Sequence, residues 1–144
     1  QLTTAVPPDT PAKIGAFADL AKPGIKLVVC APAVPCGAAT VKVEQATGVM
    51  LKPVSEEQAV TDVLSKVQAG EADAGLVYKT DVKSAGDTVK GIDFPESAKA
   101  INNNSIVALT KGPQAALGQQ FVDLVLSAEG QKVLADAGFG KPAA

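Results

Sequence analysis

Three continuous apolar runs of strand length lie along the chain, over residues 25–30, 74–78 and 105–109. None of them alternates between apolar and polar positions. Continuous runs of this kind are typical of strands buried on both faces, as in parallel sheets covered by helices. Two weaker β-prone runs, 2–6 and 89–94, end at prolines, which cannot continue a β-ladder.

The clearest helical pattern lies between the apolar runs 25–30 and 74–78. Val60, Val63, Leu64 and Val67 have the i, i+3, i+4, i+7 spacing of one helical face, and Gly70 ends the pattern. The preceding stretch 55–58 has the sequence Ser-Glu-Glu-Gln, which fits a capping box. These residues predict a helix that starts at Ser55.

Further helices are predicted over residues 38–47, 114–126 and 128–137, and Ser127 is a suitable N-cap for the last one. The helix 114–126 is expected to turn three residues inward: Phe121, Leu124 and Val125.

Strands and helices thus alternate, which predicts an α/β fold with a mainly parallel sheet flanked by helices. Ligands of such sheets bind beyond the carboxyl ends of the strands, beside helix N-termini. This rule directs attention to the segments after Cys30, before Val60 and around Tyr78.

The amino-acid composition argues against several classes of function. The 144 residues carry a net charge of −2, all 13 basic residues are lysine, and arginine, histidine and tryptophan are absent. Without histidine there is no imidazole base for a nucleophile pair, which argues against an enzyme. Without arginine or a basic excess, nucleic acid is not expected as a partner.

The loop 31–37 joins a predicted buried strand to a helix and contains two stiffening prolines. Free backbone N–H groups at such a helix start can bind an anion, although an ordinary strand-to-helix connection is the more common explanation of such a loop. Cys30 and Cys36 flank it, and their closeness favours a disulfide in an exported protein over two buried free thiols. They offer too few ligands for a closed metal site.

Tyr78, the only tyrosine, ends the second apolar run. Its ring can pack in the core while its hydroxyl reaches a ligand cleft, or it can be a core-edge residue with a satisfied hydroxyl.

The stretches 29–37, 75–81, 127–134 and 137–140 together resemble the molybdate-binding proteins of bacterial ABC transporters. The resemblance implies a periplasmic binding protein-like fold of type II, in which two α/β lobes enclose a tetrahedral oxyanion such as molybdate or tungstate. It further implies an exported protein, periplasmic or anchored at the cell surface, that delivers its ligand to a membrane permease. No cofactor is implied, and no metal is directly coordinated by side chains.

Matching the family's ligating positions one by one, the resemblance implies that the oxyanion binds the backbone N–H of Cys36, the amide of Val60 and the hydroxyl of Tyr78. A free Val60 amide conflicts with a helix that starts at Ser55. A start nearer Gln58 removes the conflict.

The resemblance also implies a domain organisation, with a crossover strand at 1–7, the second lobe at 8–103, and a return strand with two helices of the first lobe at 104–144. Nothing in the chain corresponds to the N-terminal part of the family. We therefore expect a fragment or an engineered form with weakened binding. The alternative is a ligand-free α/β scaffold that forms a homodimer through the surface left by the missing segment.

Overall fold

A computed structural model describes residues 1–9 and 12–142. The chain divides into two compact units, Gln1–Asn102 and the segment from Asn103 onward, and each is described by itself. No helix in the described ranges has both the length and the apolar character needed to cross a membrane.

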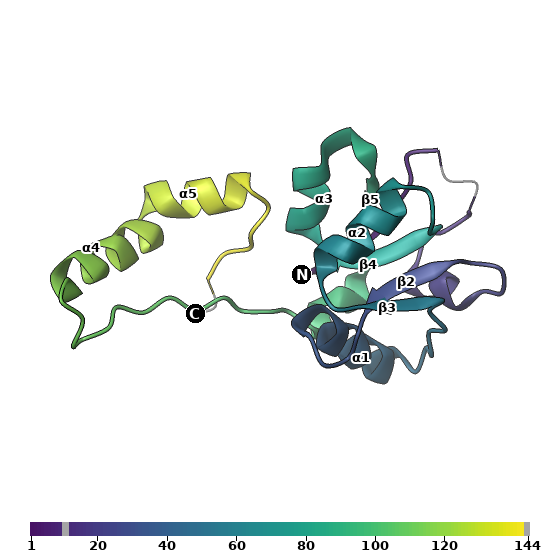
Figure 1. Cartoon of the computed structure of the whole chain (residues 1–144), viewed down its shortest axis with the longest axis horizontal. Coiled ribbons are helices and arrows are strands. Elements are labelled where there is room, and N and C mark those ends of the chain that lie inside the picture. Colours follow the sequence, from purple (N-terminus) through teal and green to yellow (C-terminus); the bar gives the residue numbers. More distant parts are fainter. Residues whose placement is uncertain (10–11, 143–144) are drawn as a thin grey trace. The chain divides into compact units, whose positions relative to one another are not determined.

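The larger unit is built on one five-stranded sheet in the order β3-β2-β4-β1-β5 (Figure 1). The strands are β1 (Leu2–Val6), β2 (Leu27–Cys30), β3 (Ser55–Glu57), β4 (Ala74–Tyr78) and β5 (Lys90–Ile92). β2 is parallel to both β3 and β4. β1 lies between β4 and β5 and runs opposite to both, so each of its pairings is antiparallel. The α/β prediction is confirmed, and the sheet is mixed where a mainly parallel one was expected.

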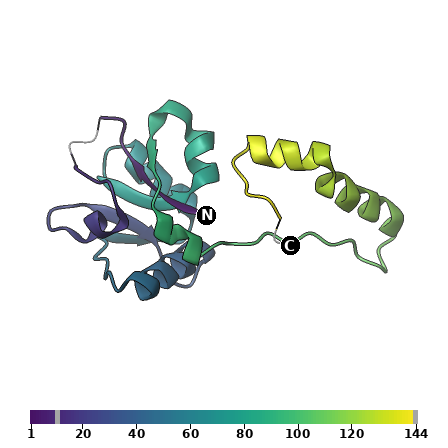
Figure 2. The same ribbon diagram turned by 180° about the vertical axis from the view of Figure 1, so that it is seen from behind.

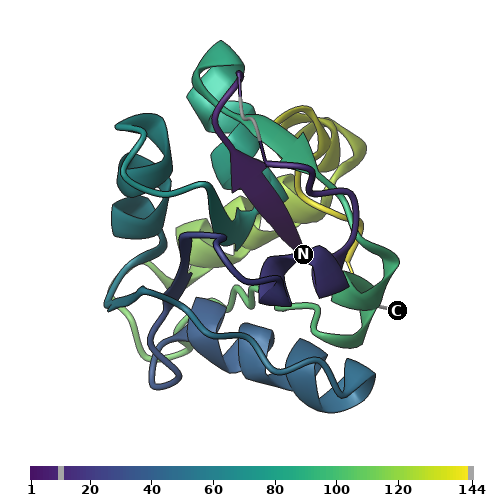
Figure 3. The ribbon, with the colours of Figure 1, turned by 90° about the vertical axis from the view of Figure 1, so that its right-hand side faces the viewer.

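Helices cover both faces of the sheet, as the continuous apolar strands predict. Along β2, Leu27 and Val29 belong to one buried cluster, whereas Val28 and Cys30 belong to the cluster on the opposite face. The first cluster packs against α1 (Pro35–Thr47), and the second packs against α2 (Val60–Gln68) and α3 (Lys79–Ala85). Figures 1 and 3 show α1 on one side of the sheet and α2 on the other.

Three 3₁₀ helices complete the larger unit: η1 (Phe17–Ala21), η2 (Gly86–Thr88) and η3 (Pro95–Lys99). η3 lies beside α1 (Figure 2). Phe17 of η1 packs on Phe94 with ring centroids 5.1 Å apart, and both side chains are buried in the cluster under α1. This aromatic pair closes the α1 face of the sheet.

The predicted helix start at Ser55 is wrong, because Ser55–Glu57 forms the edge strand β3 and α2 begins at Val60. The backbone of 55–57 pairs with β2, with Ser55 opposite Val28 and Glu57 opposite Cys30. The Glu57 carboxylate accepts hydrogen bonds from Lys66 and Ser55, which lowers the pKa of Glu57. The residues 55–57 therefore pair with β2 instead of capping a helix, and Glu57 also forms an ion pair with Lys66.

The unit from Asn103 onward contains α4 (Ala115–Leu126) and α5 (Ala128–Asp136). The Ser127 hydroxyl accepts a hydrogen bond from the Gly130 N–H at 3.2 Å, which confirms the predicted N-cap. The predicted strand at 105–109 is wrong: the run pairs with no strand in the described residues, and Val107 and Leu109 are 79% and 75% exposed.

The expected inward face of the helix 114–126 is wrong for two of its three residues, whereas Val125 is half-buried. Phe121 is 60% exposed and Leu124 is 51% exposed, while Val122 is the buried residue of α4. Apolar residues thus lie on surfaces that this small unit does not cover by itself.

The contact of α2 with β4 depends on the absence of a side chain at Gly75. A Cβ atom at this position would lie 2.7 Å from Cγ1 of Val63 and 2.9 Å from Cγ2 of Val67. We predict that Gly75→Ala lowers the free energy of unfolding by about 1–3 kcal/mol, because it overpacks this contact. Equilibrium unfolding in urea measures the loss.

Gly15→Ala is the matched control, because the nearest heavy atom to an added Cβ there is the Asp19 carboxylate oxygen at 3.8 Å. Its free energy of unfolding should stay within about 0.5 kcal/mol of the parent chain. Equal stability of the Gly75→Ala and Gly15→Ala variants would contradict the close packing of α2 on β4.

Candidate functional site

The loop after β2 leads directly into an uncapped helix N-terminus. The Val34 N–H donates to the Ala31 carbonyl at 3.1 Å, and Pro35 occupies the first turn of α1. The N-cap Val34 supplies no side-chain acceptor to the first turn. Within the described part of the chain, the Cys36 N–H has no hydrogen-bond partner. Such amides, at the positive end of the helix dipole, attract an anion.

Gly37 is required by the close approach of this loop to α1. A Cβ atom there would lie 1.9 Å from the Ala31 carbonyl oxygen, so no larger residue fits the observed backbone. The first turn of α1 is therefore held directly against the end of β2.

A disulfide links the end of β2 to the first turn of α1. It joins Cys30, the last residue of β2, to Cys36 in the first turn of α1, with the Cα atoms 5.6 Å apart. The predicted bridge is confirmed, and the alternative of two free thiols is wrong. Both cysteines are buried, so the bond restrains the residue whose amide was predicted to bind the oxyanion.

The second predicted amide belongs to the first residue of α2. Val60 follows the N-cap Ala59, which supplies no side-chain cap, and its N–H has no partner among the described residues. The expected helix start nearer Gln58 than Ser55 is confirmed, because α2 begins at Val60.

Tyr78 ends β4 and is the N-cap of α3. Its backbone N–H donates to a carboxylate oxygen of Asp81 at 2.8 Å. Burial, followed by the charge of Asp81, raises the pKa of the Tyr78 hydroxyl above its ordinary value, and a hydrogen bond from Asn102 opposes this rise. Burial likewise raises the pKa of Asp81. The ring is thus half-buried with its backbone fixed, and its hydroxyl stays protonated at neutral pH.

Asn102 is the polar partner that sequence reasoning missed. Its Nδ2 atom donates to the Tyr78 hydroxyl oxygen at 2.5 Å, across 24 residues of sequence. The triplet Asn102-Asn103-Asn104 was visible in the sequence, but nothing in it distinguishes the residue that makes this contact.

The three predicted site residues all contact the apolar cluster on the sheet face covered by α2. Cys36 is buried in this cluster and Val60 packs against it, whereas the Tyr78 side chain packs against this cluster and also against the one under α1. Their role as ligands stays a prediction.

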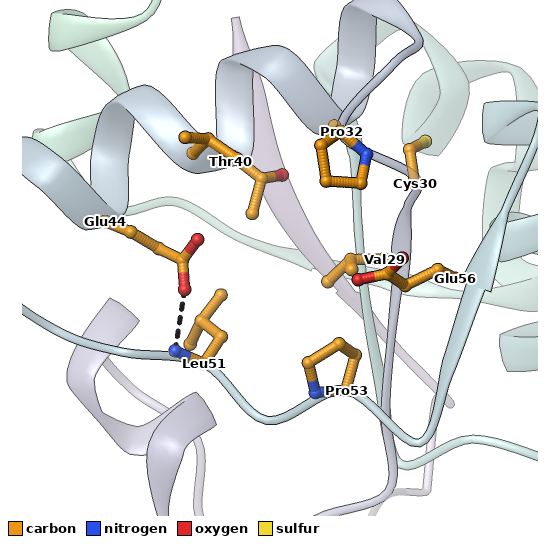
Figure 4. A pocket seen from close by; sticks show the side chains of 10 residues that line it. Val29, Cys30, Pro32, Thr40, Glu44, Leu51, Pro53 and Glu56 are labelled. Carbon is orange, nitrogen blue, oxygen red and sulfur yellow. Dashed lines mark hydrogen bonds between the residues drawn. The ribbon is translucent and has the colours of Figure 1, made fainter.

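A hollow of about 80 Å³ lies beside α1. It is lined by Cys30 and Pro32 at the end of β2 and by the carboxylates of Glu44 and Glu56 (Figure 4). One oxygen of Glu44 accepts from the Leu51 N–H at 2.7 Å, as the dashed line in Figure 4 marks. Two carboxylates in so small a space repel an anion, so this cavity does not suit one.

Among the described residues, neither a cluster of metal-ligating side chains nor the lysines at the surface provide another candidate site for a ligand. Within the described ranges, no three metal-ligating side chains of the His, Cys, Asp or Glu type come together. A shallower hollow near Lys83 also contains Lys79, but that ammonium group pairs with Asp93 at 2.7 Å. The uncapped helix starts and Tyr78 are left as the candidate site.

Comparison with known proteins gives one family and a group of relatives. The family described as bacterial extracellular solute-binding protein matches residues 1–140. Relatives 52% identical over 132 residues are the molybdate-binding protein ModA of Mycobacterium bovis and of Mycobacterium tuberculosis. These matches cover 92% of this chain and 51% of each relative, so the chain spans about half the length of these relatives.

Two solved structures share the fold. The substrate binding domain of a putative molybdenum ABC transporter from Clostridium difficile has a TM-score of 0.70 at 21% identity, covering 99% of this chain and 63% of that one. A two-component system protein that mediates signal transduction has a TM-score of 0.68 at 18% identity, covering 95% and 52%. At such identities the likeness shows the fold alone.

Reduction of the Cys30–Cys36 disulfide should destabilise the chain. The bridge closes a short loop, with a sequence separation of 6 residues. In the chain-entropy model its removal costs about 2–3 kcal/mol. We expect the midpoint of urea unfolding to fall when reductant is added. The Cys30→Ser, Cys36→Ser double variant should show the same loss without reductant.

Alkylation under denaturing conditions provides the control. Intact mass should show no label without reductant and two labels with it, because the sequence has two cysteines. Two labels on the unreduced chain would contradict the bridge.

Proposed function

The chain belongs to the bacterial extracellular solute-binding proteins, and from this premise we propose that it contributes to a binding site for a tetrahedral oxyanion, molybdate or tungstate. The observation that carries the proposal is that two helices without a side-chain cap start with residues that pack in one apolar cluster, Cys36 and Val60, and that the Tyr78 side chain packs against the same cluster. The molybdate-binding names of the 52% identical relatives support this ligand class.

Binding would depend on neutral hydrogen-bond donors. The amides of Cys36 and Val60 and the hydroxyl of Tyr78 would face the dianion, with the N-termini of α1 and α2 adding partial positive charge. The first turn of α1 contains no acidic residue that would oppose this field. Each hydrogen bond to a charged ligand contributes about 1.5–3 kcal/mol.

A lining of donors also accounts for selectivity. A protonated oxyanion would bring an O–H group that finds no acceptor, and an unsatisfied buried donor is costly. The size of the enclosed space would then separate molybdate and tungstate from the smaller sulfate. The proposed role is capture and release, with no bond of the ligand broken.

The remaining parts of the proposal concern the whole protein. We assign residues 1–7 to a crossover strand, 8–103 to one lobe of a clamp, and 104–144 to a return segment with helices of the other lobe. The protein would work outside the cytoplasm, in the periplasm or anchored to the cell surface, and would pass the oxyanion to the permease of an ABC transporter.

Calorimetric titration tests the ligand and the role of Tyr78 together. We expect molybdate and tungstate to bind more tightly than sulfate, and Tyr78→Phe to weaken molybdate binding about ten- to a hundredfold, because one donor to a dianion is lost. Ser65→Ala, which removes an exposed hydroxyl from α2, should leave binding unchanged.

Equal affinity for sulfate and molybdate would overturn the proposed selectivity. Unchanged affinity in the Tyr78→Phe variant would remove the hydroxyl from the site.

Self-association as a ligand-free scaffold is the second candidate. The observation that favours it is a group of exposed apolar side chains in α4 and α5: Leu117, Phe121, Leu124, Leu126 and Val133. Burial of such side chains between two copies is favourable. Light scattering after gel filtration should then give twice the chain mass of 14.5 kDa, with a melting temperature that molybdate does not change. A monomer stabilised by molybdate would exclude the scaffold role.

A further inference from the structure

We propose that Asn102 is a positioning residue of the oxyanion site. Its side-chain amide donates a hydrogen bond to the Tyr78 hydroxyl oxygen, and the phenol proton is then left free for the ligand. This inference rests on the proposed function, in which the Tyr78 hydroxyl is one of the donors. It assigns to the site a residue that does not touch the oxyanion itself.

The chemistry of a phenol gives this contact its meaning. A tyrosine hydroxyl has one proton to donate and lone pairs with which it can accept. Because Asn102 Nδ2 supplies a proton to the oxygen at 2.5 Å, the hydroxyl accepts on that side and must direct its own proton elsewhere. An acceptor in the same place would instead consume the proton and present lone pairs to a dianion.

No other group in the described part of the chain takes that proton, since the hydroxyl makes no hydrogen bond there besides the one from Asn102. The acidic side chain near the ring is Asp81, and one of its oxygens accepts the backbone N–H of Tyr78. The phenol oxygen therefore accepts a hydrogen bond from Asn102, while the phenol proton has no acceptor among the described residues. A donor to an oxyanion requires such a free proton.

The position of Asn102 along the chain adds a second consequence. It is the last residue of the larger unit, directly before the segment that starts at Asn103. The hydrogen bond to Tyr78 consequently fixes the end of that unit to the site, and the exit of the chain is anchored at a ligand-binding residue.

The composition permits a direct experiment, because Tyr78 is the only tyrosine and the chain has no tryptophan. The ultraviolet absorbance of phenolate, followed against pH, reports the ionisation of this one hydroxyl. A donor to the oxygen stabilises phenolate, so Asn102→Ala should raise the pKa of Tyr78. Asn102→Asp should raise it further, because a carboxylate accepts the phenol proton and repels the phenolate.

Asn104→Ala is the matched control. Asn104 is exposed and has no side-chain hydrogen bond among the described residues, so its removal should leave the titration unchanged. Far-ultraviolet circular dichroism across the pH range checks that each variant stays folded. A lower pKa in Asn102→Ala would show that the amide oxygen faces the phenol, and an unchanged pKa would show that the contact is not made. Either result overturns the proposal.

Molybdate titration provides the ligand arm. Asn102→Ala should weaken molybdate binding about five- to tenfold through loss of orientation, and Asn102→Asp should weaken it more. Molybdate binding unchanged in both variants would overturn the positioning role. If the unmodified chain does not bind molybdate, the proposed function fails, and with it the ligand role of the phenol proton. The absorbance titration still decides the contact of Asn102 with Tyr78.

Discussion

Parallel pairing of β2 with β3 and with β4 brings the carboxyl ends of three strands to one edge of the sheet. The register sets Cys30 opposite Glu57, so the connections into α1 and α2 leave from the same level. β4 adds Tyr78 at its own end. Each strand end is followed by the start of a helix. The starts of α1 and α2 receive no side-chain cap from their N-cap residues, whereas at the start of α3 the Asp81 carboxylate accepts the Tyr78 N–H. The direction of the strands therefore brings the proposed donors to one edge of the sheet, and each loop sets their exact positions.

Two local features let helices lie close to these strands. At the end of β2, the absence of a side chain at Gly37 and the Cys30–Cys36 bond hold the first turn of α1 against the strand. Under α2, Gly75 lets the helix approach β4 through Val63 and Val67. Both features restrain backbone rather than side chains, which suits the proposed site, because most of its proposed donors are main-chain groups. Preorganised donors lose little entropy when a ligand arrives.

The parts of the fold that the sequence predicted are those with strong local signals. Continuous apolar runs identified β2 and β4, and Ser127 identified the start of α5. The Ser55–Glu57 strand was missed because its three residues are polar and its pairing with β2 is not visible locally. The run 105–109 has strand composition, but no strand pairs with it in the described residues. Cys36 and Val60 were assigned to the candidate site from a family resemblance, and their role as ligands stays a prediction. Asn102 could not be found in this way, because its contact with Tyr78 spans 24 residues.

The uncapped amides at the starts of α1 and α2 have an evolutionary consequence. A main-chain N–H is present in every amino acid except proline, so a donor of this kind survives almost any mutation of the residue that carries it. Val60 could be exchanged for many side chains during divergence while its amide stayed in place, provided that α2 kept its start. The inheritance of such a site is carried by backbone geometry. Residues with no obvious chemistry, such as Gly37 and Gly75, would then be under stronger selection than the residue whose amide is proposed to bind the ligand.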